Sequence, residues 1–155
     1  MESAEFLDRL ESLLVPNEYR KRITRNVPQT WRFYRKGAYI FAAVPYSEVP
    51  PADYGNTYVK RVVKSIVFAL PVVAEKGLFL LHYGAAADWE PHKEKHRVDK
   101  TALRPIILQS IHYVDPASGA NCNSRTAWGP IKFGFCGQVI QKIERLCTQL
   151  GKDAD

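Results

Sequence analysis

Two apolar runs, Leu78-Phe79-Leu80-Leu81 and Ile106-Ile107-Leu108, enclose a polar segment, Asp88-Trp89-Glu90-Pro91-His92-Lys93-Glu94-Lys95-His96-Arg97. Short apolar runs bounded by glycine and proline are typical of buried strands. Polar groups at the ends of such strands need partners, because an unpaired polar group is costly to bury. We therefore predict that residues 78–83 and 101–114 are core strands, and that a charged loop or a short helix joins them.

Two histidines, His82 and His112, lie near the ends of these predicted strands. In an antiparallel pair they would be too far apart to share a ligand, whereas in a parallel pair both would lie at the carboxyl edge, where open sheets bind ligands. The connection is long for a hairpin and sufficient for a crossover, which favours the parallel pair. The sequence then predicts a pocket bounded by Tyr83, Trp89 and Tyr113, with the two imidazoles as its acid or base.

The other two histidines, His92 and His96, are four residues apart. On an α-helix this spacing places both imidazoles on one face, where they could hold a divalent metal such as zinc. The pattern is not His-Glu-x-x-His, so metalloprotease geometry does not apply. The competing interpretation is a solvated helix, because Lys93-Glu94-Lys95 lies between the two histidines. We predict no other cofactor.

The three cysteines, Cys122, Cys136 and Cys147, are odd in number and widely spaced. With no secretory leader in the sequence, we expect reduced thiols and a cytoplasmic protein. Cys136 and Cys147 fall in an apolar helical pattern and are expected to be small buried hydrophobes. Cys122 lies in a polar segment, where it could act as a nucleophile beside His112 or His82.

The net charge of +6 is unevenly distributed. The first fifteen residues carry four acids and one base, whereas residues 16–36 carry seven bases and one acid. The seven basic residues are Arg20, Lys21, Arg22, Arg25, Arg32, Arg35 and Lys36. Tyr19, Trp31, Phe33 and Tyr34 are interleaved with them, as in proteins that hold single strands by phosphate contacts and base stacking. The competing interpretation is a solvated basic face, because alternation along a strand would turn Trp31 and Phe33 into the core together.

Hydrophobic periodicity predicts the remaining elements. The predicted helices span residues 3–14, 17–24, 56–69 and 138–150. The predicted hairpin spans residues 30–44, and residues 120–132 are expected to form a loop. A strand over 65–74 remains the alternative to the third helix, and Gly151 is expected just after the last one. Together these elements predict one α+β domain over residues 1–155. Its sheet is expected to be mixed and mainly antiparallel, with the N-terminal and C-terminal amphipathic helices packed on it.

The charge pattern favours a nucleic-acid or polyanion binding module that uses residues 20–36. The alternative is an enzyme or small-ligand-binding protein with a histidine-lined pocket around His82 and His112. A third interpretation is a protein whose helices mediate association, which includes a homodimer. No run approaches about 18 apolar residues, so no membrane partner is expected.

Overall fold

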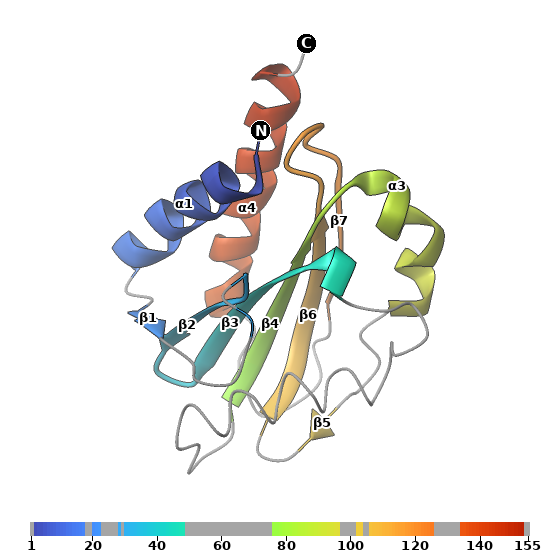
Figure 1. Cartoon of the computed structure of the whole chain (residues 1–155). Helices are drawn as coiled ribbons and strands as arrows, with labels where there is room; N and C mark the ends of the chain where they lie inside the picture. The colour runs from blue at the N-terminus through green and yellow to red at the C-terminus, as the bar shows by residue number, and fades with distance from the viewer. Residues whose placement is uncertain are drawn as a thin grey trace.

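The structure, a computed structural model, describes residues 2–17, 20–22, 28, 30–48, 76–96, 102–103, 106–125 and 134–153 of the chain. Within them, helices α1 (Ser3–Leu14) and α4 (Gly134–Asp153) lie side by side on one face of a single twisted sheet (Figure 1). The short helix α3 (Ala86–Trp89) and the 3-10 helix η4 (Glu90–His96) follow β4, and Trp89 packs on the opposite face. No helix in the described part of the chain has the length and apolarity that crossing a bilayer requires.

The sheet has a parallel centre between antiparallel margins. The described strands are β1 (Arg20–Arg22), β2 (Arg32–Lys36), β3 (Tyr39–Pro45), β4 (Lys76–Tyr83), β5 (Ala102–Leu103), β6 (Ile106–Val114) and β7 (Asn121–Arg125). Their order is β1-β2-β3-β4-β6, and both β5 and β7 pair with β6. Strand β4 is parallel to both β3 and β6, whereas the four outer pairings are antiparallel. The predicted α+β class with a mixed sheet is confirmed, as is the parallel pairing of the two central runs. The sheet was expected to be mainly antiparallel, whereas its central strand β4 has a parallel neighbour on each side.

The continuous apolar runs of β3 and β4 follow from burial on both faces, which is usual for parallel strands. Along β4, Leu78 and Leu80 enter one core cluster, and Phe79 and Leu81 enter the other. A bulge in β6 shifts its register against β4 after Leu78. Two cores therefore form, one on each side of the sheet, and neither face of the central strands is left to solvent.

The core under α1 and α4 confirms the predicted end helices. Leu7, Leu10, Ile143 and Leu146 are all buried there. Their spacing of three residues within each helix places them on one stripe, and that stripe faces the sheet. The predicted hairpin is also present, since β2 and β3 pair across the two-residue turn that contains Gly37.

Several local predictions are wrong because strand pairing overrides the local pattern. The helix predicted over residues 17–24 is absent from their described part, because Asn17 ends the 3-10 turn η1 (Val15–Asn17) and Arg20–Arg22 pair with β2 as a strand. The predicted strand 101–114 is broken, because Leu103 pairs back onto Ile106. The polar residues of β7 form a strand rather than a loop, since pairing with β6 uses backbone groups. The helix predicted over 56–69, with its alternative strand over 65–74, lies outside the described residues.

Asp115 joins the end of β6 to the start of α3. Its Oδ2 accepts hydrogen bonds from the Ala86 N–H at 3.1 Å and the Ser118 hydroxyl at 2.8 Å, and its Oδ1 accepts one from the Ala117 N–H at 2.8 Å. Burial alone would raise the pKa of this carboxyl, but the hydrogen bonds from Ser118, Ala117 and Ala86 hold the pKa below its usual value. The carboxylate thus fixes the turn that follows β6.

The turn at Asp115 also packs against the end of α4. Gly119 has φ +73, and a Cβ placed on it would lie 2.3 Å from the carbonyl oxygen of Cys147. On the helix side Gly151 is less constrained, because its Cβ would lie 3.4 Å from the carbonyl oxygen of Ser118. The helix continues past Gly151 to Asp153, so this glycine does not end it as predicted. The two glycines face each other across a backbone-to-backbone contact that tolerates a side chain on one side alone.

We expect Asp115→Asn to lower the free energy of unfolding at pH 7 by about 1–3 kcal/mol, because the amide cannot accept all three hydrogen bonds. The folded-state pKa of Asp115 lies below its unfolded value of about 3.9. Its stabilisation is therefore present above that value and is lost as the pH falls through the folded-state pKa. Urea unfolding of both proteins from pH 7 to pH 3 should show that the difference between their free energies of unfolding decreases in acid. A difference that is constant with pH would contradict this role of Asp115.

We expect Gly119→Ala to destabilise the fold by about 2–4 kcal/mol, since it combines a left-handed backbone with a clash against the helix. The matched change Gly151→Ala should be neutral or should stabilise by up to about 1 kcal/mol, because alanine favours a helix interior. Urea midpoints of the two variants measure the difference. Equal effects would refute the close approach of the turn to α4.

Candidate functional site

Strand β1 brings the basic segment onto the edge of the sheet. Its register places Arg20 opposite Arg35, Lys21 opposite Tyr34, and Arg22 opposite Phe33. Side chains alternate between the two faces along a strand, and directly paired residues share a face. The cations of β1 and β2 are therefore divided between the α1 face and the opposite face.

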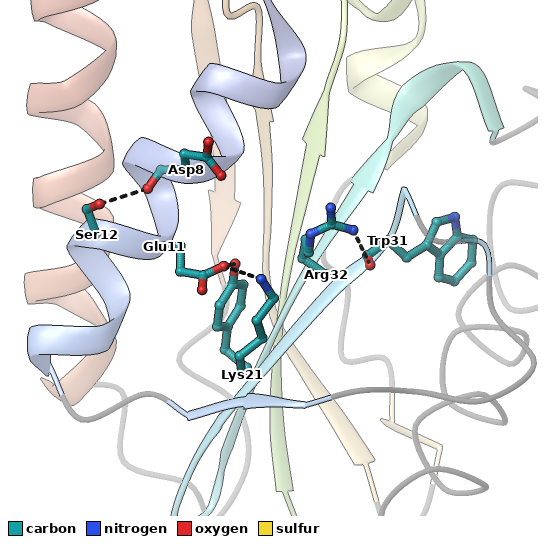
Figure 2. A network of polar contacts seen from close by, with 7 residues as sticks. Asp8, Glu11, Ser12, Lys21, Trp31 and Arg32 are labelled. Atoms are coloured by element: carbon teal, nitrogen blue, oxygen red, sulfur yellow. Dashed lines mark hydrogen bonds and ion pairs between the residues drawn. The ribbon is translucent and has the colours of Figure 1, made fainter.

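On the α1 face, Lys21 is held by the helix. Its Nζ lies 2.7 Å from Oε2 of Glu11, and the Tyr34 hydroxyl donates to the same oxygen at 3.1 Å (Figure 2). The Lys21 ammonium, with help from the Tyr34 hydroxyl, holds the pKa of Glu11 below its usual value despite burial. Burial, reinforced by the neighbouring Glu11 carboxylate, raises the pKa of the Tyr34 phenol. This network fastens β1 to α1.

Arg32 shares that face, because its partner Ala43 belongs to the core under α1 and α4. Its Nη1 donates to the Trp31 carbonyl at 3.2 Å, and Figure 2 shows both residues beside the Lys21 network. Lys36 takes the same face by alternation. The α1 side of the basic segment therefore has an acidic helix against it and internal partners for its cations.

The opposite face carries Arg20 and Arg35, whose guanidinium groups have no carboxylate partner among the described residues. Arg20 is exposed and makes no ion pair there. Arg35 is half-buried and donates from Nε to the Gly37 carbonyl at 3.4 Å. Since these two residues are directly paired, their charges are concentrated at one place on the edge of the sheet. Arg25 and the side chain of Arg22 lie outside the described residues.

The three aromatic residues of this segment that the structure describes do not offer a stacking surface, and Tyr19 lies outside the described residues. Trp31 and Phe33 are buried together in the core opposite α1, with ring centroids 6.2 Å apart. This confirms that strand alternation turns both of them inward. Tyr34 is buried in the other core. A ligand of this edge would therefore find no stacking partner in Trp31, Phe33 or Tyr34.

His82 lies in a buried aromatic cluster at the carboxyl edge of β4. Its ring stacks on Tyr113 at 5.4 Å and meets Tyr46 edge-on at 6.2 Å, and Trp89 stacks on Tyr113 at 5.6 Å. All four side chains are almost fully enclosed, with His82 0% exposed. Trp89 and Tyr113, two of the three residues expected to bound a pocket at His82, do lie in this cluster. Nothing in the sequence pointed to Tyr46, which enters through the 3-10 turn η2 (Tyr46–Glu48).

His112 is on the other side of the sheet. The register pairs it with Leu81, whose side chain belongs to the core under α1 and α4, whereas His82 pairs with Tyr113. Tyr83 also turns to that side, where it packs on Phe6 with ring centroids 6.1 Å apart. The parallel pairing thus brings both histidines to one edge of the sheet, but it places them on opposite faces. They line no common pocket, which corrects the expected joint site.

Cys122 lies on β7 directly opposite Tyr113, which in turn pairs with His82. Two strand spacings, roughly 10 Å, therefore separate the backbones of Cys122 and His82, and Tyr113 lies between them. His112 faces the other side, so the structure brings Cys122 together with neither histidine. Burial raises the pKa of the Cys147 thiol to about 12, in line with its expected role as a buried hydrophobe. The side chain of Cys136 lies outside the described residues.

The segment with His92 and His96 is the 3-10 helix η4 rather than an α-helix. With three residues per turn, positions i and i+3 are eclipsed and positions i and i+4 diverge by about a third of a turn. The shared face that the zinc hypothesis required is therefore absent from this backbone. The side chain of His96 lies outside the described residues. Within the described part, no three histidine, cysteine or acidic side chains gather closely enough to hold a metal ion.

Glu11 is the residue of this region that sequence reasoning missed. The acidic face of α1 and the basic segment were recognised separately, and their proximity in sequence was the available signal. Only the β1–β2 pairing shows that Glu11 meets Lys21 and leaves Arg20 on the far side.

Comparisons of this chain with protein-family models, with curated proteins and with solved structures found no match, so the function is argued from the geometry above.

Proposed function

We propose that the chain binds nucleic acid through its phosphates, using the face of β1 and β2 that carries Arg20 and Arg35. The observation that supports this proposal is the direct pairing of two arginines in an antiparallel ladder, with no carboxylate partner among the described residues. Like charges directly opposite each other destabilise a strand pair by a few tenths of a kcal/mol to about 1 kcal/mol. An anionic group between the two guanidinium groups reverses that cost and accepts their hydrogen bonds.

Charged residues on an edge strand also prevent sheets from pairing edge to edge. That role is met by charge of either sign and on either face. Protection of the edge does not explain why two cations, Arg20 and Arg35, are paired directly on the face remote from α1. No acidic residue among the described ones is paired with them there. The arrangement is better suited to a ligand whose charges are negative and regularly spaced.

The geometry also bears on the mode of binding. Trp31, Phe33 and Tyr34 are buried, so they are not available to stack on bases. Arginine contacts to phosphates fix a protein on a nucleic acid without reading its sequence. We therefore expect weak sequence preference, binding that falls steeply with salt, and no requirement for unstacked bases.

Replacing Arg20 and Arg35 together by glutamine should weaken binding to a random oligonucleotide duplex, because each guanidinium group neutralises phosphate charge. The double change should also reduce the slope of log K against log salt by about 1 for each phosphate that the protein no longer neutralises. Fluorescence anisotropy titrations at several salt concentrations measure both quantities.

The matched control is Lys36→Gln with Lys152→Gln. It removes the same net charge, from the α1 face of β2 and from the end of α4, and it keeps Lys21 on Glu11, so it should retain most of the affinity. Circular dichroism of both double variants confirms that they fold. Equal weakening by the two variants would show that net charge alone acts, and wild-type protein that fails to bind at about 50 mM salt would end the proposal.

A further inference from the structure

The outer surfaces of α1 and α4 border an open groove of about 520 Å³. Residues spaced three or four apart line it from each helix, which places each set on one stripe of its helix. Glu5 and Asp8 lie on the α1 side, and Lys142 and Arg145 lie on the α4 side. The α1 wall has these two carboxylates and one cation, Arg9, whereas the charged residues of the α4 wall are cations alone, so the first wall is net acidic and the second is basic.

The charges of the groove are not all matched within the described residues. Glu5 is paired with Arg9 at 2.9 Å. Asp8 and Arg145 line the same groove, yet neither side chain has an ion-pair partner in the part of the chain that the structure describes. Asp8 on α1 and Arg145 on α4 therefore present charges of opposite sign to the groove, neither of them matched within the described residues.

The floor of the groove is apolar. Leu13 is half-buried and Leu146 is buried between the charged walls. An apolar strip with a charged rim is the usual composition of a protein–protein interface.

We infer that this groove docks a second copy of the chain as a two-fold dimer. In a two-fold interface the same patch contacts itself, so residue i of one copy meets residue j of the other and the reverse. A surface with one acidic wall and one basic wall is complementary to itself under that symmetry. Asp8 of each copy then faces Arg145 of the other, which gives both charges the opposite charge that the described residues of one chain do not supply. This inference does not depend on the proposed nucleic-acid binding.

The test uses the full chain and two charge reversals, Asp8→Lys and Arg145→Glu. By sedimentation at low salt, the wild-type protein should have twice the 17.6 kDa mass of one chain. Each single variant should be a monomer, because two cations in the first variant, or two carboxylates in the second, would face each other at both ends of the interface. Circular dichroism spectra and urea midpoints close to those of the wild type show that both variants are folded.

An equimolar mixture of the two variants distinguishes this pairing from a general effect of charge. In the mixed dimer, one ion pair joins the introduced lysine to the introduced glutamate, and the other is the natural pair of Asp8 with Arg145, so the dimer should return. A wild-type monomer, single variants that remain dimers, or a mixture that stays monomeric would each overturn the inference. Because none of these measurements involves nucleic acid, their outcome is separate from that of the proposed function.

Discussion

Parallel pairing of β4 with both β3 and β6 is the constraint on which the rest of the structure depends. Parallel strands need long connections, and they are normally covered on both faces. Here α1 and α4 cover one face, and Trp89 of α3 enters the core on the other. Polar side chains that fall on these strands are therefore enclosed. Antiparallel pairs occur at the margins of the sheet, where β1, β2 and β7 carry polar and charged residues.

The same constraint determines what the histidines can do. Parallel register puts His82 and His112 at the same carboxyl edge, and the side-chain period of two places them on opposite faces. His82 stacks on Tyr113 and meets Tyr46 edge-on, and Trp89 stacks on Tyr113, so the imidazole is part of an aromatic core. Described charged groups without an ion-pair partner include Arg20 and Arg35 on the strand edge, and Asp8 and Arg145 beside the groove between α1 and α4. Exposed charge on the margins and close packing at the centre both follow from the pairing of this one sheet.

The secondary structure elements could be predicted from the sequence where their residues are strongly buried. The apolar runs at 78–83 and 106–114 and the stripes of α1 and α4 identified the strands and helices, because hydrophobic period and burial agree there. The register was not predictable, since one residue of slip exchanges the faces and a bulge near Gln109 shifts β6 against β4. The short polar strands β1 and β7 were missed because backbone pairing forms them without an apolar pattern. The division of cations between two faces depends on that pairing, so the sequence could identify the basic segment but not which cations share a face.

The central functional claim is that the face of β1 and β2 remote from α1 is the part that meets an anionic ligand. A titration of ¹⁵N-labelled protein with a short oligonucleotide duplex, followed by NMR, tests it most directly. We predict that the Nε–H resonances of Arg20 and Arg35 shift together with the backbone amides of β1 and β2. Signals of α1 and of the aromatic core around His82 should remain in place. Shifts centred on α1 and α4, or spread evenly over all cations, would contradict the account.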